Sequence, residues 1–242
     1  MSDPLTLPVL GSATGAPALP LLLAESFEWP KLLFSLVQPA APMARGDGRP
    51  VLVYPGFLAN DLATIRLRRS LRAADYSAQG WGLGPNLIVR ENLLERLVQR
   101  LTATVAESRA DGRGDKASLI GWSLGGIFAR EVAKLRPDLI DRVITLGTPF
   151  SGDPRSNNGW WLYEFINSHP VDAPPLAIEA SVKPPVPTFA VWSAIDGVVA
   201  PAAARGHPDE SDRQVEVRAR HLSLTRSPVT IAQIGELLTA PI

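Results

Sequence analysis

The sequence contains no cysteine, which excludes disulfide bonds, thiolate zinc sites and a cysteine nucleophile. It has no excess of charge of either sign, because 24 basic residues balance 24 acidic ones. Nucleic-acid binding depends largely on clustered lysine and arginine, so we expect no nucleic-acid partner. No apolar run approaches the roughly 18 residues that span a membrane, so we expect no integral membrane segment.

The N-terminal residues lack the features of a secretory signal. No basic residue precedes Lys31, and the apolar patch from Leu19 to Ala24 is short and contains a proline. A chain without cysteine is stable in either redox environment, so its composition favours neither. We therefore expect a cytoplasmic protein, and the sequence indicates no particular oligomeric state.

Length and periodicity predict one α/β domain. The 242 residues are 45% hydrophobic, which is enough for one sizeable core. Apolar runs predict about six strands, at 51–54, 76–81, 117–121, 142–146, 186–192 and 214–219. Amphipathic segments between them predict helices at 60–74, 91–108, 124–135 and 229–238. This alternation predicts a mostly parallel sheet with helices on both faces and function at the carboxyl ends of its strands.

Residues 1–49 are expected to form an arm and a helical segment packed on the core, and residues 50–242 the main domain. The first 20 or so residues are rich in proline, glycine and alanine, which is typical of a surface arm. Apolar spacing from Leu21 to Val37 indicates helix, interrupted by Pro30.

The most informative segment is Gly-Trp-Ser-Leu-Gly-Gly at 121–126, between a predicted strand and a predicted helix. An abrupt strand-to-helix turn strains the residue at its centre and points that side chain out of the sheet. Glycines two positions before and after Ser123 avoid collisions that a Cβ would cause. A helix N-terminus also favours a developing oxyanion. We interpret Ser123 as a nucleophile in a nucleophile elbow; the alternative is a glycine-rich turn with a capping serine.

A serine nucleophile needs a base, and the base needs an acid to hold its useful tautomer. Of the three histidines, His221 follows the last predicted strand, at the same sheet edge as Ser123. His169 and His207 lie in predicted loops. Asp196 follows the fifth predicted strand, and the chain order Ser, Asp, His favours it as the acid. The alternative for Asp196 is a turn aspartate before glycine.

The segment at about 149–185 interrupts the strand–helix alternation. It is rich in proline and carries the aromatic group Trp160, Trp161, Tyr163 and Phe165. Loops of this length are uncommon in compact domains unless they are functional or have structure of their own. We interpret the segment as a small helical cap over the site; the alternative is a surface excursion covered by its own tryptophans.

With these residues assembled, the chain resembles the α/β-hydrolase superfamily, and within it the bacterial lipases and esterases. The resemblance runs from about Val51 to Leu238. It rests on the segment at 121–126 and on Thr145-Leu146-Gly147-Thr148-Pro149, Asp196-Gly197-Val198-Val199 and His221-Leu222. It implies the α/β-hydrolase fold and a Ser-His-Asp catalytic triad.

The resemblance also implies an oxyanion hole made by the N–H groups of Leu124 and Phe57. In this chain Tyr54-Pro55-Gly56 precedes Phe57, where many lipases carry His-Gly. The implied reaction is cleavage of a small-molecule or lipid-like carboxylic ester through an acyl-enzyme on Ser123. It implies no metal and no organic cofactor.

An apolar, aromatic cap indicates a hydrophobic acyl or alcohol group in the substrate. The residues that we expect to line the substrate pocket are Leu58, Trp122, Phe150, Trp160, Trp161 and Phe165. The first three are equally typical of core packing. Two other functions stay open on this fold, an acyltransferase that uses the same triad and a non-catalytic binding protein.

Overall fold

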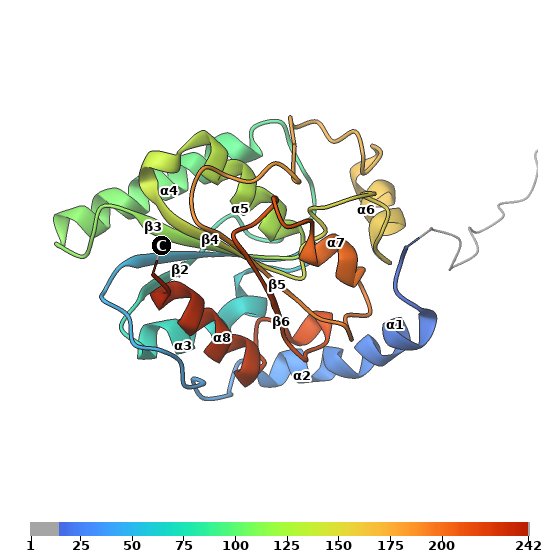
Figure 1. The fold of residues 1–242 in the computed structure, drawn as a ribbon, viewed down its shortest axis with the longest axis horizontal. Helices are drawn as coiled ribbons and strands as arrows, with labels where there is room; N and C mark the ends of the chain where they lie inside the picture. Colours follow the sequence, from blue (N-terminus) through green and yellow to red (C-terminus); the bar gives the residue numbers. More distant parts are fainter. Residues whose placement is uncertain (1–14, 242) are drawn as a thin grey trace, which may run out of the picture.

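The computed structural model describes residues 15–241, which build a six-stranded sheet (Figure 1). The order is β2-β1-β3-β4-β5-β6, and every neighbouring pair is parallel. The strands are β1 (Pro50–Tyr54), β2 (Ser77–Gly80), β3 (Ala117–Trp122), β4 (Ile140–Leu146), β5 (Thr188–Trp192) and β6 (Arg213–Glu216). The expected parallel sheet is therefore confirmed.

The last strand is shorter than the sequence predicts, because it ends at Glu216 rather than at Ala219. Within residues 15–241 it pairs only with β5, which ends at Trp192. The carbonyl of Trp192 accepts one further hydrogen bond, from Val217 N at 2.8 Å, and beyond it the chain leaves the sheet. The chain therefore leaves the sheet before His221, which is the first residue of a 3-10 turn at His221–Ser223.

Helices cover both faces of the sheet (Figure 1). The α-helices of the described residues are α1 (Leu19–Glu25), α2 (Trp29–Phe34), α3 (Ile65–Ala73), α4 (Leu93–Ala110), α5 (Leu124–Leu135), α6 (Trp160–Asn167), α7 (Pro201–Arg205) and α8 (Pro228–Thr239). Helices α4 and α5 lie on one face, and α3 and α8 lie on the other. Among residues 15–241, no helix is both long and apolar enough to cross a membrane.

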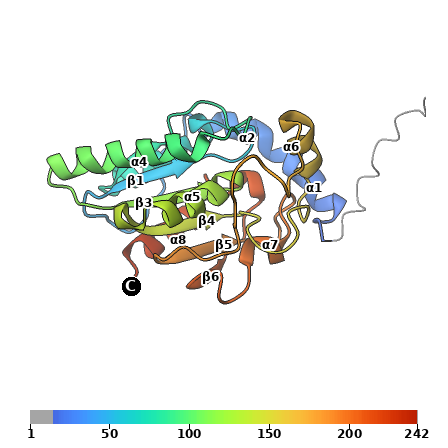
Figure 2. The ribbon, with the colours of Figure 1, turned by 90° about the horizontal axis from the view of Figure 1, so that it is seen from above.

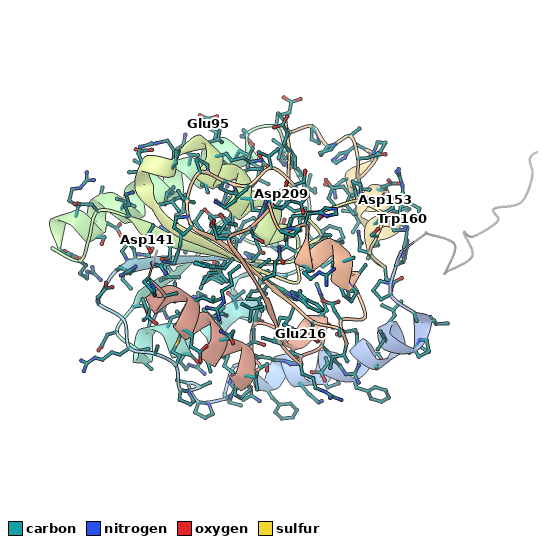
Figure 3. The ribbon with its side chains drawn as sticks, in the orientation of Figure 1. Glu95, Asp141, Asp153, Trp160, Asp209 and Glu216 are labelled. Carbon is teal, nitrogen blue, oxygen red and sulfur yellow. The ribbon has the colours of Figure 1, made fainter. Side chains whose placement is uncertain are left out.

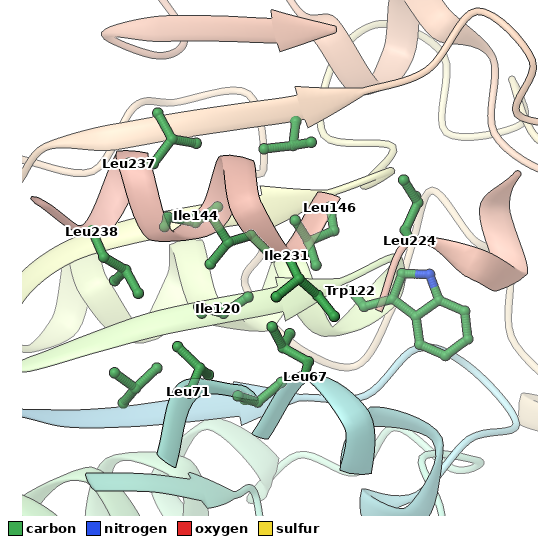
Figure 4. Packing of buried hydrophobic residues seen from close by; sticks show 14 of the residues in the cluster. Leu67, Leu71, Ile120, Trp122, Ile144, Leu146, Leu224, Ile231, Leu237 and Leu238 are labelled. Carbon is green, nitrogen blue, oxygen red and sulfur yellow. The ribbon is translucent and has the colours of Figure 1, made fainter. Parts of the chain in front are cut away.

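The sheet separates two hydrophobic cores. Successive side chains of a strand point to opposite faces, so Val51 and Val53 pack with α3 and α8, whereas Leu52 and Tyr54 pack with α4 and α5. Figure 4 shows the first core, which brings together side chains from β3, β4, α3 and α8. The four central strands β1, β3, β4 and β5 are buried on both faces and therefore require nearly continuous apolar runs, which is why the sequence pattern located them. The edge strands β2 and β6 are more polar and partly exposed.

The N-terminal helical segment has two short helices in place of one interrupted helix. A 3-10 turn at Ser26–Glu28 joins α1 to α2. Pro30 is the second residue of α2, where its missing N–H costs no intrahelical hydrogen bond, so it starts a helix and breaks none. Residues 1–14, most of the expected arm, lie outside the described residues.

The expected cap segment, 149–185, contains one helix, α6, in otherwise irregular chain. An isolated bridge joins Asn157 to Val199 in the loop after β5. Helices α1 and α6 lie at the same end of the molecule in Figures 1 and 2. Figure 3 labels Trp160 at this end and Asp141, near the amino end of β4, at the opposite one. The cap segment and α1 therefore lie toward the carboxyl ends of the strands.

Candidate active site

Ser123 occupies a tight turn between β3 and α5. Its φ of 53° lies in the left-handed region, which is strained for a residue with a Cβ. Its carbonyl accepts a hydrogen bond from Gly126 N at 2.9 Å, which closes the turn. A Cβ on Gly121 would collide with the backbone of Gly126, and one on Gly125 would lie 2.5 Å from Pro55 O. These glycines are needed at the positions that the sequence analysis identified.

His221 and Asp196 form a buried pair at the same end of the sheet. His221 Nδ1 lies 2.8 Å from Asp196 Oδ2, and the two residues are 3% and 1% exposed. The other carboxylate oxygen, Oδ1, accepts hydrogen bonds from Val198 N and Val199 N, both at 2.8 Å. These bonds fix the carboxylate plane. A proton on Nδ1 leaves Nε2 of His221 free to accept a proton.

The surroundings of His221 raise the pKa of its imidazole above the ordinary histidine value. Burial alone lowers this pKa, because it disfavours the charged ring. The charge and hydrogen bond of Asp196 act in the opposite direction, and the charge of Glu25 adds to them. The imidazole is therefore a stronger base than an exposed histidine, available at pH values above its raised pKa.

Ser123 and His221 line one cavity of about 720 Å³. Four of the expected pocket residues line it as well, namely Leu58, Trp122, Phe150 and Trp160. Trp122 also contacts His221 directly, since its indole N–H donates to His221 O at 3.2 Å and the two ring centroids are 5.7 Å apart. The structure thus brings together the serine, the histidine and an apolar wall.

Two expected pocket residues do not line the cavity. Trp161 and Phe165 are 44% and 80% exposed, and the α6 side chains that face the cavity include Trp160 and Tyr163. Residues three or four apart share one face of a helix, so Trp160 pairs with Tyr163, whereas Trp161 pairs with Phe165 on another face. The expectation that all these aromatic residues line the pocket is wrong for Trp161 and Phe165.

Apart from His221, the charged residues that line the cavity are acidic in the part of the chain that the structure describes. Its carboxylates belong to Glu25, Asp172 and Glu179, and no lysine or arginine lines it. Asp172 is paired with Arg155, whose guanidinium lies 2.7 Å away. Within the described residues, the cavity therefore offers apolar contacts and no lysine or arginine for a negatively charged ligand.

The loop after β1 lies against Ser123. A Cβ on Gly56 would approach the Ser123 Cβ to 3.1 Å, so a side chain at this position would have to displace Ser123 by a few tenths of an ångström. Phe57 lines the cavity and Leu124 is the first residue of α5, where the N–H has no intrahelical partner. Leu58 has a φ of 64°, so the loop is strained next to Phe57.

Asn86, which the sequence analysis did not identify as functional, holds this loop. Its side chain is 1% exposed and donates from Nδ2 to Pro55 O at 2.9 Å. Its backbone accepts from Leu58 N at 2.9 Å and donates to Ala59 O at 2.7 Å. Three hydrogen bonds from one residue thus fix the position of Phe57.

Two further residues near the His–Asp pair were missed. A Cβ on Gly147, which has a φ of 52°, would lie 3.0 Å from Asp196 Oδ2 and 3.1 Å from His221 Nδ1. Glu25 of α1 accepts a hydrogen bond from His221 N at 2.8 Å. The sequence signal for Gly147 was its place directly after β4; Glu25 had none.

The other two histidines lie elsewhere. His169 follows α6, where its ring meets Tyr163 edge-on at a centroid distance of 5.4 Å. His207 is exposed in the loop after α7. Neither lines the cavity that contains Ser123.

Comparison with solved structures finds the same architecture in enzymes named for ester or glyceride hydrolysis. EstE1, a thermostable carboxylesterase cloned from a metagenomic library, is 15% identical with a TM-score of 0.62, over 92% of this chain and 99% of that one. A soluble variant of monoglyceride lipase from Saccharomyces cerevisiae is 15% identical with a TM-score of 0.59, over 82% and 89%. Esterase Pf2001 of Pyrococcus furiosus is 15% identical with a TM-score of 0.55, over 80% and 83%. The chain matches no family model.

Proposed function

Because the chain has the fold of the α/β-hydrolases, we propose that it is a serine hydrolase that cleaves carboxylic esters. Ser123 is the proposed nucleophile, His221 the base and Asp196 the acid that orients it. The observation that carries the proposal is the buried hydrogen bond of 2.8 Å between His221 Nδ1 and Asp196 Oδ2, beside a cavity that Ser123 also lines.

The proposed reaction has two halves. In the first, Ser123 Oγ attacks the ester carbonyl carbon while His221 Nε2 takes the hydroxyl proton and Asp196 stabilises the imidazolium. The N–H groups of Leu124 and Phe57 donate to the oxyanion, which then collapses and expels the alkoxide. The imidazolium protonates that alkoxide. In the second half, water gives a proton to His221 Nε2 while the water oxygen attacks the acyl carbonyl carbon. The imidazolium then returns this proton to Ser123 Oγ as the acyl–serine bond breaks, which releases the carboxylic acid and restores the serine hydroxyl.

The cavity favours a neutral ester with a hydrophobic acyl group. Apolar walls such as Phe57, Phe150 and Trp160 stabilise bound methylene groups, each by up to about 0.8 kcal/mol. The acidic wall lacks a lysine or arginine within the described residues, so phosphate-bearing acyl carriers find no partner there. Esters of uncharged alcohols are therefore the proposed substrate class.

A fluorophosphonate probe tests the nucleophile directly. We expect the probe to label Ser123 in the wild-type protein, as located by mass spectrometry, and S123A to lose both labelling and hydrolysis of p-nitrophenyl esters, by about 10⁴-fold in kcat. The matched control is S181A, because Ser181 lines the same cavity and should leave labelling at Ser123 intact. Labelling of another serine would contradict the proposal.

The products separate hydrolysis from acyl transfer. Incubation of a p-nitrophenyl ester with a competing alcohol or thiol should yield mainly the free carboxylic acid, because water is the proposed second acceptor. Predominant transfer to the added nucleophile at low concentration would identify an acyltransferase instead.

A further inference from the structure

Glu25, the last residue of α1, has its carboxylate buried behind the proposed base. It is 3% exposed, and it forms no ion pair with a lysine or arginine among residues 15–241. A buried carboxylate is costly unless strong hydrogen bonds compensate for its lost hydration. The partners that compensate Glu25 therefore indicate what this carboxylate does.

Its hydrogen bonds come from two loops at the proposed site. Oε1 accepts from Gly197 N at 3.0 Å and from His221 N at 2.8 Å, and Oε2 accepts from Leu222 N at 3.1 Å. Gly197 directly follows Asp196, so one carboxylate is bonded to the loop of the proposed acid and to the loop of the proposed base. The relative position of Asp196 and His221 thus depends on Glu25.

The rest of α1 is shaped to bring the carboxylate there. A Cβ on Gly197 would collide with Leu21 O, so the helix rests directly on the Asp196 loop. Asn158 of the cap segment donates to Gly197 O at 2.8 Å and to Pro17 O at 3.0 Å, which ties the start of α1 to the same loop. Leu22 lines the cavity. The N-terminal segment is therefore part of the site and not only of the outer surface.

We propose that Glu25 is a positioning residue, which holds the Asp196 and His221 loops at their working separation and places a second negative charge behind the imidazole. This inference rests on the proposed function for its kinetic consequences, and on the hydrogen bonds alone for its structural ones.

The charged groups that act on the imidazole are Asp196, from the loop after β5, and Glu25, from α1. Both raise the pKa of His221 against the effect of burial. Removing the charge of Glu25 should therefore lower that pKa, and the low-pH limb of kcat/KM should move to lower pH. A residue that supports the fold without contacting either loop would not move this limb.

Glu28 supplies a matched control from the same segment. It is also buried, at 7% exposed, and pairs with Arg226 and with Lys31, whose Nζ lies 2.9 Å from its carboxylate. Its partners do not include Asp196 or His221. The variant E28Q should therefore loosen the N-terminal segment without changing the His–Asp pair.

The kinetic experiment compares E25Q, E25D and E28Q with the wild type. E25Q keeps the side-chain size but replaces one acceptor by a donor, so we expect kcat to fall about ten- to a hundredfold with KM changed less than about threefold. The low-pH limb of kcat/KM in E25Q should move to lower pH. E25D keeps the charge but is too short to hold both loops, so kcat should fall while the limb moves less than in E25Q. E28Q should lower the melting temperature and leave kcat and the limb unchanged.

An NMR titration of the three histidine rings keeps the test independent of ester hydrolysis. We expect the His221 ring to titrate at lower pH in E25Q than in E28Q or the wild type. If the wild type hydrolyses no ester, the proposed function fails, yet this titration still decides the role of Glu25. The inference is overturned if His221 titrates alike in E25Q and E28Q, or if E25D retains wild-type kcat.

Discussion

Replacing Gly147 by alanine tests the packing behind the proposed acid and base. Gly147 directly follows β4 with a φ of 52°, and an added Cβ would lie 2.6 Å from Leu224 Cδ1, 3.0 Å from Asp196 Oδ2 and 3.1 Å from His221 Nδ1. Leu224 can shift, because its contact atom is the end of a flexible side chain. Asp196 and His221 are fixed by hydrogen bonds and can yield only by separating.

The expected loss of stability has two parts. The left-handed backbone costs a residue with a Cβ roughly 1–2 kcal/mol, and overpacking costs about 1–3 kcal/mol. Gly112 isolates the first part, because it has a φ of 67° and a Cβ there would have no neighbour within 4 Å. We therefore expect G112A to lower the free energy of unfolding by roughly 1–2 kcal/mol and G147A by about 2–5 kcal/mol.

Urea unfolding and ester kinetics measured on both variants separate the two effects. G147A should lower kcat about ten- to a hundredfold, since small displacements of the acid and base are costly, whereas G112A should keep wild-type kcat. Equal losses of stability in the two variants, together with wild-type kcat in G147A, would refute the packing argument.

Three further predictions concern the base, the acyl pocket and the oxyanion loop. Since His221 must be neutral and its pKa is raised, kcat/KM should fall as pH drops through a value above about 6.5; H207A should keep that limb. In a chain-length series of p-nitrophenyl esters, W160A should weaken the preference in kcat/KM for octanoyl over acetyl esters, by up to about 0.8 kcal/mol per methylene. The control W161A, which alters an exposed side chain, should retain this preference. N86A should lower the free energy of unfolding, measured in urea, by about 1–3 kcal/mol. In steady-state kinetics it should reduce kcat more than it raises KM. An unchanged kcat would show that Asn86 does not position the oxyanion loop.

The sheet and the serine turn were predictable because their signals are local. Continuous apolar runs identify strands buried on both faces, and the glycines at 121 and 125 are needed by neighbours within a few residues or on an adjacent loop. The pairing of Asp196 with His221 was predictable from topology, since each residue follows a strand of the parallel sheet. Topology then brings the carboxyl ends of those strands to one edge.

The role of Glu25 could not be predicted, because its partners lie 172 and 196 residues away at Gly197 and His221. No periodicity in a short helix reports a contact of that kind. The orientation of α6, in which Trp160 lines the cavity and Trp161 does not, was missed for a different reason. Its sequence begins Trp-Trp-Leu-Tyr, which is apolar on every side, so helical periodicity could not tell Trp160 from Trp161.

The two sides of the proposed site differ in the kind of group that acts on the reaction. On the side of His221 lie two buried carboxylates, Asp196 and Glu25, which would stabilise the imidazolium that the proposed reaction forms when Ser123 loses its proton. On the oxyanion side the proposed donors are neutral backbone N–H groups, of Phe57 and Leu124, assisted by the N-terminus of α5. Changes on the first side should therefore shift the pH dependence as well as the rate. Changes on the oxyanion side remove donors that do not titrate, so they should lower kcat and leave the low-pH limb where it is.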